Sequence, residues 1–240
     1  MCGKSRTYNK RLNVLSESDI AALWITFRLA LITTLILLLF GTPLAWWLAH
    51  SRGRFKLIIE AVVSLPLVLP PTVLGFYLLI LLGAQGPIGG LFISLGGDAP
   101  VFRFSGLVIG SVLYSLPFVV QPLRDSFAMQ SPRLLEAAAT LHAGPLDRFF
   151  SVALPLARHG FLTASVLGFA HTVGEFGVVL MIGGNIPGQT QVLSIAIYDH
   201  VESLEYAQAH WLSGGLLLLS FVMLLSVYAV NQRIKPGRAA

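Results

Sequence analysis

The sequence is poor in cysteine and in charged residues. Among its 240 residues there is one cysteine, Cys2, so an internal disulfide and a cysteine-based metal or redox site are excluded. Charged residues make up 11% of the chain, whereas soluble domains carry about 25%. Hydrophobic residues make up 55%, and the mean hydropathy is +0.77. This composition is that of an integral membrane protein, for which membrane lipid is an expected partner.

Motifs for the common enzymatic chemistries are also missing. The chain has no G-x-x-x-x-G-K-[ST] run to cradle a nucleotide and no H-E-x-x-H or comparable metal spacing. The six histidines are scattered, and nothing places Ser, His and Asp together. The net charge of +5 does not indicate nucleic acid, because the basic residues fall between apolar runs, where orientation and lipid head groups explain them. We expect no catalytic residue, no metal site and no nucleic-acid partner, and an enzyme is disfavoured.

Five apolar runs predict an all-α, integral membrane fold with five transmembrane helices in one domain. Each run reaches or approaches the roughly 20 residues needed to cross about 30 Å of hydrocarbon. The membrane domain is expected to cover residues 20–232, between a polar N-terminal segment, 1–19, and a basic tail, 233–240. The predicted spans are residues 22–49, 57–82, 105–123, 160–182 and 210–230.

The distribution of Lys and Arg predicts the orientation. If the polar segment between the third and fourth spans is cytosolic, so are the short loop 50–56 and the tail, and the internal loops then obey the positive-inside rule. The N-terminal segment, with Lys4, Arg6, Lys10 and Arg11, does not obey it. Either this segment is tolerated outside, or residues 1–13 are an extension upstream of the true start. We favour the second interpretation.

The longest amphipathic stretch of the chain is 131–155. Ser131 is a good N-cap, Pro132 a good first helical residue, and Gly144-Pro145 a helix stop. Between these ends, apolar residues recur at helical spacing and give a short helix one apolar face: Leu134, Leu135, Ala138 and Leu141. A second, aromatic-rich segment follows and is broken at Pro155. Such a bent hairpin is either a docking element or an interfacial helix on the bilayer, and the pattern leaves both open.

The predicted fourth span contains a carboxylate, Glu175. A carboxylate inside a span costs roughly 2.5–3.5 kcal/mol, so it normally faces a protein interior, a partner or a water path. His171 lies four residues earlier on the same helical face and is the nearest candidate partner. Glu175 is either part of a gate, as a hydrogen-bonded latch, or a polar clamp that packs helices together. Both roles remain open.

Prolines interrupt the predicted second span. Each of Pro66, Pro70 and Pro71 removes a backbone donor, and the carbonyls that this frees need other partners. Broken helices near the middle of a membrane often flank transport sites. A structural kink explains Pro66 at least as well. For the bend from Pro70 to Thr72 we favour a place in a translocation pathway.

Four sequence motifs together resemble a family of transport proteins. Glu136-Ala137-Ala138, with Val152 and Leu154-Pro155 at the usual spacing, resembles the EAA loop of ABC importer permeases. The proline-rich run at 66–76, the GEFG tetrad at 174–177 and the NIPGQT loop at 185–190 look like the molybdate-type branch of the oxyanion (molybdate, tungstate, sulfate) permeases. One position departs from the family pattern, because His142 stands where Gly is usual. We expect Gly144, two residues on, to take over the turn.

The resemblance implies a type I importer permease in a prokaryotic cytoplasmic (inner) membrane. In this family the loop forms coupling helices that sit in a cleft of a cytosolic ATPase. The corresponding coupling residues are Leu134, Leu135, Glu136, Ala137, Ala138, Leu141, His142, Gly144 and Pro155. The expected pathway or gate residues are Pro70, Pro71, Thr72, His171, Glu175, Phe176 and Asn185.

The resemblance also implies partners. They are a second copy of the chain, a separate ABC ATPase that carries ATP and Mg²⁺, and an extracytoplasmic oxyanion-binding protein. This chain itself is expected to bind no cofactor.

The sequence therefore predicts the permease subunit of an ATP-driven importer for a tetrahedral oxyanion, molybdate or tungstate, with sulfate or thiosulfate as the alternative. A rival from another class is an ion-coupled transporter or channel that uses Glu175 and His171 as a proton relay. The EAA-like loop discriminates between them, because a channel has no use for a cytosolic coupling hairpin.

Overall fold

The structure is a computed structural model that describes residues 16–233. Every regular element in that part of the chain is a helix. The predicted extension, 1–13, and residues 234–240 of the predicted tail lie outside the described residues.

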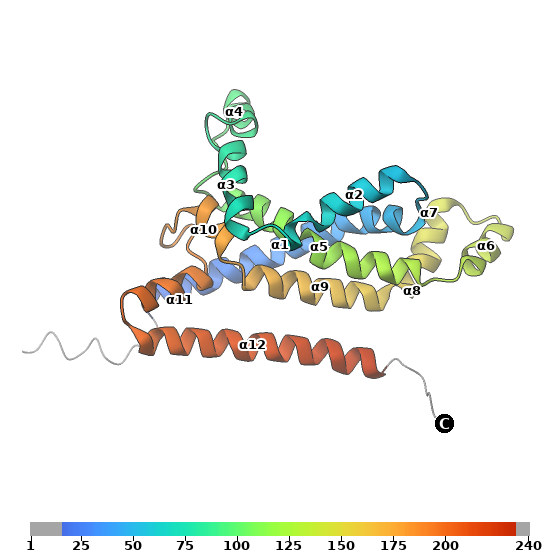
Figure 1. The fold of residues 1–240 in the computed structure, drawn as a ribbon. Helices are drawn as coiled ribbons and strands as arrows, with labels where there is room; N and C mark the ends of the chain where they lie inside the picture. Colours follow the sequence, from blue (N-terminus) through green and yellow to red (C-terminus); the bar gives the residue numbers. More distant parts are fainter. Residues whose placement is uncertain (1–15, 234–240) are drawn as a thin grey trace, which may run out of the picture.

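Three long helices lie side by side and form the core of the bundle (Figure 1): α1 (Glu17–His50), α5 (Phe104–Ala128) and α9 (Arg158–Val173). Ser16 caps α1 with a capping box, in which the Ser16 hydroxyl accepts from the Asp19 N–H and the Asp19 carboxylate accepts from the Ser16 N–H. Glycine lets α9 approach α5 closely, since an added Cβ at Gly168 would lie 2.5 Å from Val119. Apolar residues of all three helices, among them Leu37, Leu123 and Ala164, are fully buried there.

The predicted second span is not one helix. Its residues form α2 (Arg54–Ser64), a 3₁₀ turn η2 (Leu65–Leu67) and α3 (Pro71–Leu82). Pro66 lies within the turn, and Pro70 is the N-cap of α3, where a missing N–H costs no helical bond. α4 (Pro87–Ser94) follows, and in Figure 1 α3 and α4 project away from the long bundle.

The remaining elements gather at the two ends of the bundle (Figure 1). At one end lie α6 (Pro132–Thr140), α7 (Pro145–Arg148), the π-helical turn η3 (Phe149–Ala153) and α8 (Leu154–Leu156). At the other end lie α10 (Gly177–Gly183) and α11 (Leu193–Glu202). The last helix, α12 (Tyr206–Arg233), runs along the bundle and packs mainly on α11 and α9.

In the described part of the chain, four helical stretches are long and apolar enough to cross a membrane: α1, Pro71–Ser94, α5 and Tyr206–Ala229. A bent pair, Pro145–Leu156 with Arg158–Val173, makes a fifth if its two parts count as one span, although they meet at 71°. Within the predicted span 160–182, the helix stops at Val173 and resumes at Gly177.

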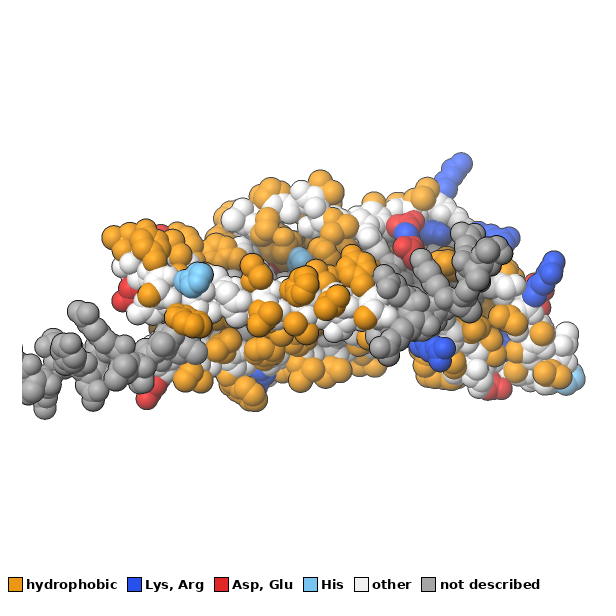
Figure 2. Space-filling view, turned by 90° about the horizontal axis from the view of Figure 1, so that it is seen from below, with side chains coloured by type: hydrophobic (Ala, Val, Ile, Leu, Met, Phe, Trp, Pro, Cys, Tyr) orange, Lys and Arg blue, Asp and Glu red, His pale blue; other side chains and the backbone are white. Residues whose placement is uncertain are grey.

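Charge and hydrophobicity are separated along the bundle. On the face seen in Figure 2, hydrophobic side chains cover most of the middle, and Lys and Arg side chains gather at the end that carries α6 and α7. The predicted arrangement of the loops places this end in the cytosol.

Candidate functional site

The segment from α6 to α8, here called the hairpin, is one candidate site. Pro132 begins α6 after the N-cap Ser131, which confirms the predicted helix start. The predicted stop at Gly144-Pro145 lies four residues too late, because Gly144 is the N-cap of the next helix, α7, and Pro145 is its first residue. The helix itself ends at Thr140. The turn therefore spans the four residues 141–144, and one of them must reverse the chain direction.

His142, not Gly144, makes this reversal. His142 has a φ of 60°, in the left-handed region that favours glycine. Gly144 has a φ of −67°, which any residue can adopt. The expectation that Gly144 takes over the turn is therefore wrong. His142 carries the strained backbone at the position where the resemblance calls for Gly.

The predicted apolar face of α6 is divided between two environments. Leu134 is 48% exposed and Leu141 is 81% exposed, and Glu136 and Ala137 also face outward. Leu135 instead packs against the buried core of the bundle, and Ala138 is half-buried. Leu134 and Leu141 are thus free to meet another chain, whereas Leu135 holds α6 to its own.

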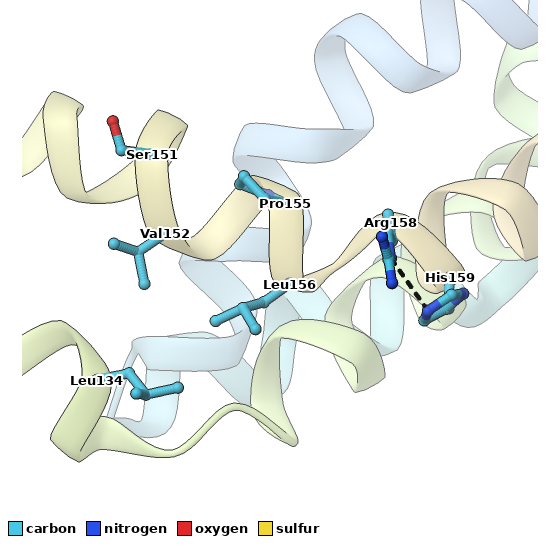
Figure 3. A pocket seen from close by; sticks show the side chains of 7 residues that line it. All are labelled: Leu134, Ser151, Val152, Pro155, Leu156, Arg158 and His159. Carbon is cyan, nitrogen blue, oxygen red and sulfur yellow. Dashed lines mark hydrogen bonds between the residues drawn. The ribbon is translucent and has the colours of Figure 1, made fainter. Parts of the chain in front are cut away.

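A hollow of about 630 Å³ lies beside Leu134 (Figure 3). Its lining comes from α6 on one side and from η3, α8 and the start of α9 on the other. The lining residues are Leu134, Ser151, Val152, Pro155, Leu156, Arg158 and His159. In Figure 3 Leu134 faces Val152 and Leu156, while the Arg158 Nε–H donates to His159 Nε2 at 3.3 Å. The hollow therefore combines an apolar part with a basic edge.

The second candidate site is a cavity of about 530 Å³ between α3, α5 and the junction of α9 with α10. Of the seven predicted pathway residues, five line it: Pro71, Thr72, His171, Glu175 and Phe176. The remaining lining residues are Tyr114, Ala170, Gly174, Gly177, Leu180 and Met181. Lys and Arg are absent from this lining, so its side chains offer an anion no permanent positive charge.

Glu175 lies in the interruption between α9 and α10. It is 3% exposed, and neither carboxylate oxygen has a hydrogen-bond partner among the described residues. The predicted pairing with His171 is wrong, because neither Glu175 oxygen is bonded to it, and the hydrogen bond of His171 joins Nδ1 to Ser115 Oγ at 2.9 Å. The pairing argument assumed one continuous helix, and the helix ends at Val173. A buried carboxylate without a partner is costly and is usually retained for a function.

Glycine allows the walls of this cavity to touch. An added Cβ at Gly177 would lie 2.7 Å from the Pro71 Cβ, and one at Gly75 would lie 2.8 Å from the Met181 Cβ. Both contacts join α3 to α10. The GEFG and proline-rich motifs are therefore adjacent in space, and their small residues set the width of the cavity on this side.

Two predicted pathway residues lie outside the cavity lining. Pro70 is the N-cap of α3, next to the lining residue Pro71. Asn185 has a φ of 54°, and its Nδ2 donates to the two carboxylate oxygens of Asp199 at 3.0 and 3.2 Å. Gln191 donates to the same carboxylate at 2.8 Å. Asn185 of the NIPGQT loop and Gln191, directly after it, therefore fasten this segment to α11.

Sequence reasoning missed the contribution of α5 to this cavity. Tyr114 lines it, and Ser115 holds His171, although it lies 56 residues earlier in the chain. The available signal was the presence of polar side chains inside an apolar span, which normally face the protein interior. Local sequence patterns cannot identify the partner of such a side chain across 56 residues.

Long apolar helices around an intramembrane cavity, with an exposed hairpin at the basic end, define a membrane transport protein. The chain belongs to the family described as "Binding-protein-dependent transport system inner membrane component", whose model matches residues 41–237. It is therefore the membrane component of a transport system and not an enzyme, and it resides in the inner membrane.

Among its relatives is the molybdenum transport system permease protein ModB of Azotobacter vinelandii, which is 60% identical over 93% of this chain and 98% of that protein. A probable sulfate transport system permease protein, cysT, of Chlorella vulgaris is 32% identical over 88% of this chain and 79% of that protein.

A bacterial alginate ABC transporter, solved in complex with an alginate-bound periplasmic protein, contains a chain with the same fold. Its TM-score is 0.75 at 16% identity, over 92% of this chain and 81% of that one. The predicted all-α, type I importer permease fold is confirmed.

Proposed function

We propose that this chain forms the membrane pathway of an ATP-driven importer for a tetrahedral oxyanion, molybdate or tungstate. The observation that carries the proposal is the similarity to the molybdenum permease of Azotobacter vinelandii, which extends over nearly the full length of both chains. Sulfate is the second candidate cargo, supported by the more distant sulfate permease. An ion-coupled transporter or channel does not fit a binding-protein-dependent family.

The cavity supports passage of an anion without tight retention. Its lining contains the polar side chains of Thr72, Tyr114, His171 and Glu175, without Lys or Arg. A tetrahedral oxyanion finds few donors there, so it can leave as readily as it enters. Selection of the anion then falls to an extracytoplasmic binding protein, the kind of partner that the family description names.

The hairpin supports coupling to an ATPase. Its outward residues, Leu134, Glu136 and Leu141, are exposed at the basic end of the bundle. An exposed apolar residue of this kind gains free energy when a partner cleft covers it. We assign the cleft to a cytosolic ABC ATPase subunit that binds ATP and Mg²⁺, with the hairpin end in the cytosol.

A second copy of the chain completes the pathway. α3 and α4 project from the bundle and expose large apolar side chains, including Phe76, Tyr77, Ile80 and Phe92. Pro71 and Thr72, at the start of α3, line the cavity, and Thr72 is exposed. A two-fold partner that covers this surface would therefore enclose the cavity on its symmetry axis.

Reconstitution tests the function. The chain, its ATPase and its binding protein are placed in liposomes, and uptake of molybdate, tungstate and sulfate is measured with ATP and with an ATPase variant that cannot hydrolyse it. We expect uptake that needs both ATP hydrolysis and the binding protein, with molybdate or tungstate preferred. Uptake without hydrolysis would contradict the importer, and a preference for sulfate would select the second candidate.

A further inference from the structure

A chain of hydrogen bonds fixes where His171 carries its proton. The Thr172 hydroxyl donates to the Gly168 carbonyl at 2.9 Å, because a carbonyl can only accept. A hydroxyl has one hydrogen, so in the 3.0 Å contact between Thr172 Oγ1 and Ser115 Oγ the serine must donate. The hydrogen of Ser115 is then used as well. In the 2.9 Å contact between Ser115 Oγ and His171 Nδ1, the donor must therefore be the imidazole N–H.

It follows that the neutral His171 ring has its hydrogen on Nδ1 and a bare lone pair on Nε2. The ring is held on its faces as well as at Nδ1. It stacks on Phe118, with ring centroids 3.8 Å apart and planes at 24°, and its centroid lies 4.9 Å from that of Tyr114. His171 lines the cavity, and its only hydrogen bond among the described residues is at Nδ1. Nε2 is thus the nitrogen left for a ligand.

A bare Nε2 is the wrong partner for an oxyanion. The oxygens of a fully ionised tetrahedral anion only accept hydrogen bonds, and a bare imidazole nitrogen also only accepts. Two acceptors cannot bond to each other. When Nε2 takes a proton from the solvent, the ring becomes an imidazolium and offers both an N–H and the positive charge that the cavity lining lacks.

We propose that His171 contacts the oxyanion through Nε2 only when that nitrogen is protonated, and that Ser115 is the positioning residue that imposes this requirement. The proposal rests on the proposed function, since it concerns the anion in that pathway. The other titratable groups in the cavity lining are Tyr114 of α5 and Glu175 of the interruption between α9 and α10. α3 and α10 contribute no titratable side chain to the lining, and α1 and α12 contribute no lining residue.

The first test measures uptake against pH in the reconstituted importer, with the same ATPase and binding protein in every sample. For the unmodified chain we expect uptake to fall as pH rises, by at most about tenfold per pH unit, because one proton is required. His171→Gln should flatten this dependence relative to the unmodified chain, since an amide always offers an N–H. Equal pH profiles for His171→Gln and the unmodified chain would overturn the proposal.

The Ser115→Ala variant tests whether Ser115 determines which nitrogen of His171 carries the hydrogen or only packs against the ring. Without the serine acceptor, the neutral ring is free to carry its hydrogen on Nε2, so uptake at high pH should rise above that of the unmodified chain. A purely structural loss would lower uptake at every pH. Ser165→Ala is the matched control, because the Ser165 hydroxyl bonds only to Phe161 O in its own helix. Unchanged or lower uptake of Ser115→Ala at high pH, with normal assembly, would refute the positioning role.

The second test reads the tautomer directly in the unmodified chain. ¹⁵N spectra of the ¹⁵N-histidine-labelled complex distinguish a ring nitrogen that carries hydrogen from a bare one, and the His171 signals are identified by their loss in His171→Gln. We expect neutral His171 to carry its hydrogen on Nδ1. A neutral ring with hydrogen on Nε2 would overturn the proposal even if oxyanion uptake is normal. Lack of ATP-driven oxyanion uptake by the unmodified chain would count against the proposed function instead.

Discussion

The hairpin and the cavity are incomplete in opposite ways. The hairpin leaves an apolar side chain in water, with Leu141 81% exposed. The cavity leaves a carboxylate in an apolar interior, with Glu175 3% exposed and both oxygens without a partner. Each arrangement costs free energy in the isolated chain. From this difference we expect the first site to be completed by another protein, and the second by cargo, by water or by movement of its own walls.

The largest effect is expected from a charge on the exposed face of the hairpin, which tests whether another protein covers this face. Burying one Leu contributes roughly 1.5–3 kcal/mol, so Leu141→Asp should weaken binding of the ATPase by about tenfold to a hundredfold. Insertion and dimerisation should be normal, because Leu141 does not pack in the core. Co-purification of the ATPase measures the effect.

Leu204→Asp is the control, because Leu204 is similarly exposed but lies in the loop between α11 and α12, at the opposite end of the bundle. If both variants retain the ATPase equally well, the hairpin is only an interfacial helix.

A change in the glycines of the cavity wall should have the next largest effect. Gly177→Ala places a Cβ 2.7 Å from Pro71, and such overpacking typically costs about 1–3 kcal/mol. Gly174→Ala, three residues earlier, meets its nearest atom at 3.6 Å and should be tolerated. Melting temperature and uptake should both fall for the first variant and change little for the second. Equal loss in the two would mean that closeness of α3 and α10 does not set the cavity width.

Glu175 tests whether polarity or charge matters in the cavity. Glu175→Gln keeps the size and the hydrogen-bonding groups, so uptake should be close to that of the unmodified chain. Glu175→Ala removes the polar group, and we expect leakage or hydrolysis of ATP without transport. Uptake and ATP hydrolysis are measured together in liposomes. Abolished uptake in a normally assembled Gln variant would show that the charge itself is needed and that the latch hypothesis is wrong.

A pH effect is expected at the end of the bundle opposite the hairpin. His200 Nε2 lies 2.8 Å from Asp19 and Nδ1 lies 2.9 Å from Glu205. Burial alone would lower the pKa of His200, but hydrogen bonds to these two carboxylates outweigh it and raise the pKa. A raised pKa in the folded state means that this stability is complete below the ordinary pKa of histidine and is lost as pH rises through the raised one.

The expected loss at high pH is about 1.5–3 kcal/mol, the range of a hydrogen bond to a charged group. It should appear as a falling melting temperature that His200→Gln makes less dependent on pH. His210→Gln, a change at an exposed histidine of α12, is the control. If the melting temperature of His200→Gln falls with pH as steeply as that of the unmodified chain, the titrating group is another residue.

The smallest expected effect concerns the turn of the hairpin. Because His142 has a left-handed φ, His142→Gly should stabilise the turn by about 1 kcal/mol. Gly144→Ala should be neutral, since Gly144 has a φ of −67° and an added Cβ would meet no atom within 4 Å. Thermal unfolding of the two variants measures both changes in stability. A destabilising His142→Gly would indicate that the imidazole makes a contact that outweighs the backbone strain.

The structural features that were predicted best are those that depend on residues adjacent in the chain. Apolar runs long enough to span a membrane predicted the helical fold, and Pro132 marked the start of a helix because proline suits the first helical position. The same local reasoning failed at Glu175. Its pairing with His171 presumed a continuous helix, whereas α9 ends at Val173 and α10, which follows, packs closely against α3, far away in the sequence.

Contacts between distant segments could not be predicted in this way. Nothing near Leu135 shows that it turns inward while Leu134 faces outward, because both fit the apolar face of a short helix. The bond from Ser115 to His171 likewise depends on how α5 and α9 pack. Periodicity shows that a face is apolar, but three-dimensional packing decides what covers it.

The placement of α12 has a consequence for how the protein is made. The three helices of the core, α1, α5 and α9, are complete once the ribosome has synthesised residue 173. α12 emerges last and adds to the outside of this core, mainly against α11 and α9. Because chains assemble from the N-terminus during synthesis, the bundle can be inserted in chain order. The packing of α1, α5 and α9 against one another does not require α12.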